Sequence, residues 1–219
     1  MALFTGKGDD GTTYAFGCDQ RFSKSSIVAE ALGSLDEINS YLGFAKLESR
    51  NFFNSKKFAN TSVASNTAHN TTIAHDTDAP VAQTSENFKF SDGKNFEQII
   101  GDVQQNLFII QAQIAGAPKT IVEEKIKILE NYIVEAEKNM PPIKTFFVSG
   151  GCQLSSLFDF ARTIARRAER RVVAVSDENL VKVDKTTLSY LNRLSSLLYA
   201  MARLSNHFSG IKEEAPNYR

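Results

Sequence analysis

Apolar residues recur at three- and four-residue intervals along most of the chain, a periodicity that predicts amphipathic helices. Five helices are expected, over residues 25–48, 95–115, 119–139, 153–176 and 185–209. Ser23 or Ser25 is the candidate N-cap of the first, and Pro118 opens the third. Only residues 145–149 have an extended pattern, and they are too few to found a sheet.

Five amphipathic helices with short connections favour an all-α, up-and-down five-helix bundle of the ferritin-like class. The exception is residues 50–95, where Asn, Ser, Thr and Ala dominate. Such a stretch buries too little apolar surface to order itself, so it is predicted as a flexible insertion between the first two helices. A length of 219 residues fits one domain, spanning 1–219, plus this insertion.

The charge balance excludes several classes of protein. Lys and Arg number 25 and so do Asp and Glu, so the chain lacks the basic excess of a general nucleic-acid or membrane-surface binder. Cys18 and Cys152 have neither a disulfide pattern nor metal-ligand spacing, which favours a reducing cytoplasm and predicts no protein metal site. Neither a membrane span nor a signal peptide is predicted.

The fourth helix carries the most specific chemistry. Arg162, Arg166 and Arg170 follow one another at four-residue spacing and are called the arginine row below, with Glu169 close to the same face. Like charges at this spacing destabilise an isolated helix by roughly 0.2–0.5 kcal/mol per pair. A solvated basic face is one interpretation. Because arginine binds planar anions through two parallel hydrogen bonds, a phosphate or carboxylate ligand is the other.

A glycine-rich segment near the N-terminus is a second candidate site. Residues 5–13 contain three glycines and several hydroxyl side chains, which permit close backbone approach to phosphate oxygens, and Lys24 adds a cation downstream. The segment lacks the Gly-Lys-Ser/Thr ending of a Walker A loop. Taken alone, it is equally typical of turns.

Three further side chains have both a structural and a functional interpretation. Asp36 is either a solvated carboxylate or a partner for an arginine of the fourth helix, and Asn192 is either satisfied by a neighbour or a donor to phosphate. Phe146, before Gly150-Gly151, is either a core residue or a platform for a flat ligand.

Together these residues resemble the PduO-type ATP:cob(I)alamin adenosyltransferases. The resemblance covers nearly the whole chain except the insertion, and its most specific part is the Arg-Arg-x-Glu-Arg run with the downstream Asn-Arg-Leu-Ser. It rests on the segments Thr5–Thr13, Ser23-Lys24, Gly33–Asn39, Phe146–Gly151, Ala161–Arg171 and Tyr190–Ser195.

The resemblance implies a five-helix bundle assembled as a homotrimer, with active sites between adjacent subunits. It implies an enzyme that transfers the 5′-deoxyadenosyl group of ATP, accompanied by Mg²⁺, to the cobalt of cob(I)alamin and releases triphosphate. A reductase that supplies the reduced corrinoid and an adenosylcobalamin-dependent enzyme that receives the product are the implied partners. The reaction needs no protein nucleophile, because the reduced cobalt attacks.

The resemblance also assigns residue roles. Arg166 is expected to stabilise the leaving triphosphate, Arg162 to pair with Asp36 across the subunit boundary, and Phe146 to press on the lower face of the corrin. ATP binding is assigned to Thr5, Gly6, Lys7, Gly8, Thr13, Lys24, Arg166, Arg167, Glu169, Arg170 and Asn192.

Two departures from the family pattern bear on the rate. Asp10 stands where the family usually has Lys, and Ser196 where it usually has Asp. They leave open an ATP- and corrinoid-binding carrier or chaperone of the same fold with weak turnover. A helical bundle whose arginines dock an acidic partner is a further alternative.

Overall fold

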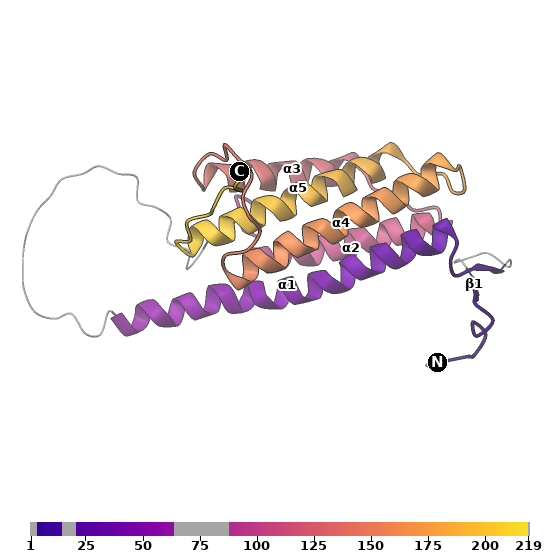
Figure 1. Cartoon of the computed structure of the whole chain (residues 1–219), viewed down its shortest axis with the longest axis horizontal. Coiled ribbons are helices and arrows are strands. Elements are labelled where there is room, and N and C mark those ends of the chain that lie inside the picture. The colour runs from indigo at the N-terminus through magenta and orange to yellow at the C-terminus, as the bar shows by residue number, and fades with distance from the viewer. Residues whose placement is uncertain (1–3, 15–20, 64–87, 219) are drawn as a thin grey trace, which may run out of the picture.

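The protein's structure, a computed structural model, describes residues 4–14, 21–63 and 88–218. Figure 1 shows long helices lying side by side, with the N-terminal segment projecting beyond one end of the bundle. The helices are α1 (Ile27–Val63), α2 (Phe96–Ile114), α3 (Glu123–Lys138), α4 (Gln153–Asp177) and α5 (Lys185–Phe208). The predicted five-helix bundle is confirmed, and α2, α4 and α5 begin and end within one residue of the predicted bounds.

Each helix packs against its neighbours through its apolar stripe. α4 lies between α1 and α5, while α2 packs on α1 and α3 packs on α5. Leu35, Ile38, Ile164 and Leu194 are almost fully buried where these helices meet. Each such side chain stabilises the fold by roughly 1.5–3 kcal/mol. The outer face of α4 is thereby held rigidly, and it carries the arginine row.

At both ends of the predicted insertion, the structure has residues that are helical or buried in the core. α1 continues to Val63 rather than ending near residue 48, and Phe52 is buried in it. Phe88 and Phe90 are also buried, and their rings pack against Phe96 at centroid distances of 6.3 and 5.9 Å. Because polar residues dominate residues 50–95, the sequence pattern does not indicate that these few aromatic side chains are buried. Residues 64–87 of the predicted insertion lie outside the described residues.

Local details at three element boundaries differ from the prediction. The N-cap of α1 is Ser26, whose Oγ accepts from the Ala29 N–H at 3.2 Å, instead of Ser23 or Ser25. α3 begins at Glu123, four residues later than predicted, because Ile121 enters the core before the helix starts. Residues 145–149 form no strand.

A short antiparallel hairpin near the N-terminus escaped the sequence prediction. It pairs β1 (Thr12–Tyr14) with β2 (Arg21–Ser23), with Thr13 opposite Phe22. Two strands of three residues are too short to leave a periodic signal. The hairpin joins the glycine-rich segment to the start of α1.

Candidate functional site

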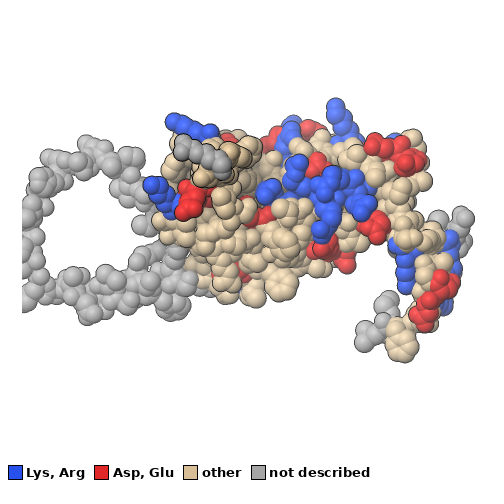
Figure 2. All heavy atoms as spheres, viewed as in Figure 1, with Lys and Arg blue, Asp and Glu red and all other residues tan. Residues whose placement is uncertain are grey.

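The arginine row occupies the solvent-facing side of α4. Figure 2 shows Lys and Arg side chains gathered over α4, with acidic side chains at the edge of the group. Arg166 and Arg170 are exposed, whereas Arg162 is partly buried. Ala161, Ile164 and Ala168 of the same helix face the core, so the amphipathic pattern fixes which way the guanidinium groups point.

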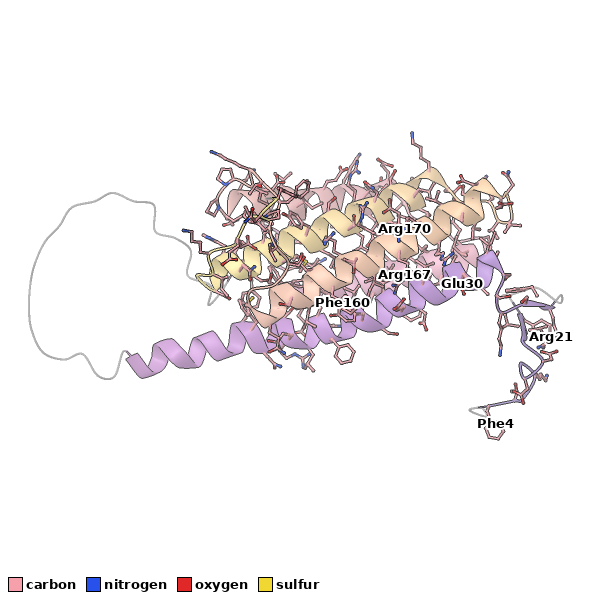
Figure 3. The ribbon with its side chains drawn as sticks, viewed as in Figure 1. Phe4, Arg21, Glu30, Phe160, Arg167 and Arg170 are labelled. Atoms are coloured by element: carbon pink, nitrogen blue, oxygen red, sulfur yellow. The ribbon has the colours of Figure 1, made fainter. Side chains whose placement is uncertain are left out.

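The arginines of α4 differ in whether a carboxylate neutralises them. Arg167 forms an ion pair with Glu37, and Arg171 Nη2 lies 3.7 Å from Glu30 Oε2, both carboxylates belonging to α1. Arg166 and Arg170 have no ion-pair or hydrogen-bond partner among the residues that the structure describes. Two cations one helical turn apart therefore present free donors on the same surface. Figure 3 labels Arg170 of this pair on α4, next to Arg167.

Asn192 of α5 braces this surface through Glu169 of α4. Asn192 Nδ2 donates to Glu169 Oε1 at 3.0 Å, and Asn192 Oδ1 accepts from Arg193 Nη1 at 2.8 Å. Arg193 Nε in turn donates to Glu130 Oε1 of α3 at 2.8 Å. The bonds bring together two of the predicted ATP-binding residues and orient the Glu169 carboxylate beside the arginine row.

The glycine-rich segment is a series of tight turns. Gly6 and Gly11 have φ of +67° and +80°, a conformation that side chains other than glycine rarely adopt. Lys24 Nζ donates to the Gly8 carbonyl at 2.7 Å, and a Cβ at Gly8 would lie 3.0 Å from that nitrogen. Lys7 is exposed and Thr13 is partly buried in β1. Thr5, Gly6, Lys7, Gly8, Thr13 and Lys24 thus belong to one compact unit.

Arg21 is the residue of this unit that the sequence interpretation missed. Its guanidinium donates to the Lys7 carbonyl, to Asp10 Oδ1 at 3.1 Å and to the Thr12 carbonyl at 3.0 Å. It also lies over the ring of Tyr14, 4.7 Å from the centroid. Arg21 holds the turns together, and only the pairing of β1 with β2 brings it there.

The same contacts account for Asp10, the anion that departs from the family pattern. The Thr12 hydroxyl donates to Asp10 Oδ1 at 2.7 Å and the Thr12 N–H donates to it at 2.9 Å. These hydrogen bonds, together with Arg21, hold the pKa of the Asp10 carboxyl below its ordinary value. Asp10 is therefore charged at neutral pH, and its charge is paired within the segment.

A large cleft lies beside the arginine row, bounded by α3, α4, α5 and the loop before α4. Its volume is about 1030 Å³. Phe146 and Phe147 line it together with Arg162, Arg166, Ser196 and Tyr218. Phe146 is 76% exposed, so the structure favours the platform interpretation over core packing. Both predicted groups, the aromatic residue and two arginines of the row, thus share one cleft.

Other predicted residues are not brought together within one chain. Arg162 Nε lies 3.7 Å from Asp159 Oδ1, and Asp36 is exposed with no ion pair in the described part of the chain. Figure 3 places Arg21 and Phe4, which flank the glycine-rich segment, well apart from Arg167 and Arg170. One chain therefore holds the predicted ATP-binding residues as two separate groups.

Among residues 4–14, 21–63 and 88–218, no three His, Cys, Asp or Glu side chains come close enough to bind a metal ion together. None of the helices in that part of the chain has the length and apolar composition to cross a bilayer.

The chain is similar in sequence to known adenosyltransferases. The family model described as cobalamin adenosyltransferase matches residues 3–205. The chain is 33% identical over 214 residues to the corrinoid adenosyltransferase PduO of Citrobacter freundii, covering 94% of this chain and 50% of that protein. It is 32% identical over 218 residues to the corrinoid adenosyltransferase of Bacillus subtilis, covering 96% of this chain and 90% of that protein. The chain thus spans about half the length of the Citrobacter relative.

Solved structures with a similar fold come from Lactobacillus reuteri. A variant PduO-type ATP:corrinoid adenosyltransferase complexed with cobalamin and ATP superposes with a TM-score of 0.72 and 25% identity, covering 98% of this chain and 99% of that one. A second variant, complexed with ATP, gives a TM-score of 0.73 and 25% identity, covering 98% and 100%.

Proposed function

The chain belongs to the cobalamin adenosyltransferase family, and we propose that it transfers the 5′-deoxyadenosyl group of ATP to the cobalt of cob(I)alamin. In this reaction the cobalt electron pair forms a bond to C5′ of the ribose. The C5′–O bond breaks and its electron pair leaves on inorganic triphosphate, while cobalt is oxidised from Co(I) to Co(III). Adenosylcobalamin and triphosphate are the products.

The protein's contribution to such a displacement is positioning and charge stabilisation. The observation that carries the proposal is the unpaired state of Arg166 and Arg170 while their neighbours Arg167 and Arg171 are neutralised by carboxylates of α1. Free guanidinium groups on a rigid helix suit the negative charge that grows on a departing triphosphate. Arg166 also lines the cleft, so it lies where nucleotide and corrinoid would meet.

The cleft suits a corrinoid. Phe146 presents an exposed ring at its wall, and a flat aromatic surface beneath a corrin keeps the lower axial ligand away from cobalt. A cobalt without that ligand is easier to reduce to Co(I). Tyr199, Phe147 and Met140 add further apolar surface to the lining.

The two separated groups of ATP-binding residues support assembly as a homotrimer. Neighbouring subunits would bring the glycine-rich segment of one chain to the arginine row of the next, and Asp36 to Arg162. α1 and α4 also expose an aromatic surface, in which the rings of Tyr41 and Phe160 lie 4.9 Å apart and Phe160 is 56% exposed. A patch of this kind is typical of a subunit interface.

We expect Phe160→Glu to dissociate the trimer, because a carboxylate at this position would be buried without a partner. Sedimentation velocity should show monomers, and turnover should fall in parallel. Ile128→Glu, on α3 and likewise partly exposed, is the matched control and should sediment as the native protein does. Native sedimentation of Phe160→Glu would contradict this interface.

Arg21→Ala should raise the KM for ATP by about tenfold, because supporting hydrogen-bond partners of a site contribute on that order. The KM for the corrinoid should stay unchanged, since the contacts of Arg21 within the described part of the chain are with the glycine-rich segment and Tyr14. Steady-state kinetics with each substrate varied in turn measures both values. An unchanged KM for ATP would remove the segment from the nucleotide site.

Mg²⁺ fits this site as a companion of the nucleotide. It prefers oxygen ligands and is ordinarily bound by one or two carboxylates together with substrate phosphates. Glu169, braced by Asn192, is the carboxylate beside the arginine row that would complete its coordination. The ion would neutralise phosphate charge while the residues of the chain orient the ribose.

Anaerobic turnover tests the proposal directly. The protein, cob(I)alamin and Mg-ATP should give the absorption spectrum of adenosylcobalamin and one triphosphate for each adenosyl group. A carrier with weak turnover is the alternative that the family departures suggested, and the internal pairing of Asp10 favours the enzyme over it. Stoichiometric binding of both ligands without catalytic product would support the carrier instead.

A further inference from the structure

A buried cluster of charges adjoins the cleft, and the proposed chemistry gives no role to its members Arg203, Asp159 and Glu213. The side chain of Arg203 on α5 is 1% exposed and forms ion pairs with both Asp159 and Glu213. Asp159 belongs to α4, is 4% exposed and lies 3.7 Å from Arg162 Nε. Glu213 belongs to residues 209–218, the C-terminal tail that follows α5, and is 15% exposed.

Asn206, one turn further along α5, ties the same carboxylate to the loop before α4. Its Nδ2 donates to Glu213 Oε1 at 2.7 Å and to the Gly150 carbonyl at 2.9 Å. Its Oδ1 accepts from the Cys152 N–H at 3.0 Å. Gly151, at φ +107°, packs so closely that a Cβ there would lie 2.3 Å from Asn206 Oδ1. The loop is therefore seated on Asn206.

The C-terminal tail and the loop also touch each other. The Val148 N–H donates to the Glu214 carbonyl at 2.9 Å. The Arg203 guanidinium lies 5.9 Å from the ring centroid of Phe147. Phe146 and Phe147 of the loop line the cleft, and so does Tyr218 of the tail. Glu213 thus ties the tail to α5, and Asn206, which donates to the same carboxylate, ties the loop to α5.

We propose that Glu213 is a positioning residue for the corrinoid, an inference that rests on the proposed function. By accepting hydrogen bonds from Arg203 and Asn206 together, it fixes the C-terminal tail against the loop and sets where Phe146 stands in the cleft. Among the described residues, its hydrogen bonds and ion pairs are with Arg203 and Asn206, and none is with the arginine row or the glycine-rich segment. Its bonds act directly on the corrinoid side of the site, whereas its path to the arginine row runs through Arg203 and Asp159 to Arg162.

Glu213→Ala should raise the KM for cob(I)alamin by about tenfold, as expected when supporting hydrogen bonds of a site are lost. The KM for ATP should stay at the wild-type value. Glu213→Gln keeps an oxygen acceptor at Oε1 and should lie within about threefold of wild type. Glu214→Ala is the matched control, because it removes an equal charge one residue away and retains the backbone carbonyl bound by Val148.

Amide hydrogen exchange gives a second readout that does not need turnover. In Glu213→Ala the amides of residues 145–152 should exchange about tenfold faster, whereas Glu214→Ala should match wild type. Absorption of bound cob(II)alamin should show more of the species with its lower ligand attached in Glu213→Ala only.

Each outcome separates this inference from the proposed function. An inactive wild-type protein would refute the proposed function, while the exchange comparison would still decide whether Glu213 holds the loop. Active wild type with an unchanged KM for cob(I)alamin in Glu213→Ala would overturn the positioning role alone. A general fall in kcat in both Glu213 variants, with unchanged KM and exchange, would also overturn it.

Discussion

Arg166→Ala is expected to lower kcat at least about a hundredfold, because one preorganised donor to a developing charge contributes roughly 2.7–4 kcal/mol. Arg166 is exposed on the cleft side of α4 and has no partner in the described chain that would hold it elsewhere. We therefore expect its removal to leave the fold and the proposed assembly intact and to take away a cation of the proposed triphosphate site. Anaerobic kinetics with saturating substrates measures the effect.

Two control variants sharpen the Arg166 experiment. Arg166→Lys keeps the charge and loses the two parallel donors, so its rate should fall between those of Arg166→Ala and wild type. Arg171→Ala removes an arginine of the same helix that lies near Glu30 instead of the cleft, and it should retain nearly full activity. An Arg166→Ala protein that keeps more than about a third of the wild-type rate would refute the assignment, given the size of effect expected for such a donor.

Arg203→Ala should lower the free energy of unfolding by about 3–5 kcal/mol, because it leaves buried carboxylates without their cation. Asp159 and Glu213 would both lose their shared cation, and the C-terminal tail would keep only the hydrogen bond from Asn206 to Glu213 among its described side-chain bonds to α5. Denaturant unfolding at one fixed protein concentration measures the loss, since assembly contributes to apparent stability.

Arg50→Ala is the matched control for Arg203. Arg50 pairs with Glu97 between α1 and α2, but its side chain is 57% exposed, and exposed pairs contribute at most about 1 kcal/mol. Similar losses for the two variants would show that the Arg203 cluster is no more important to the fold than a surface ion pair.

The helices could be predicted because their signals are local. α2 begins after Asn95, whose side chain accepts from the Gln98 N–H while Gln98 bonds back to Asn95, and this capping box stands next to a regular apolar stripe. The end of α1 could not be predicted, because Asn- and Ser-rich residues lead up to Val63 and weaken the periodic signal.

The candidate site likewise has one part that local sequence predicts and another that only the folded structure reveals. The arginine row is visible as spacing within one helix, and the structure confirms that it faces outward. Arg21 and Glu213 bond to partners outside their own segments, Lys7 at a separation of 14 residues and Arg203 at a separation of 10. No local pattern distinguishes such residues from ordinary surface charges, so only the folded chain identifies them.

The position of bound nucleotide tests the central claim most directly. A crystal structure of the assembled protein with Mg-ATP should place the triphosphate within hydrogen-bond distance of Arg166 and Arg170, with C5′ of the ribose directed into the cleft beside Phe146. A triphosphate bound away from α4, with both guanidinium groups still free in solvent, would contradict the account.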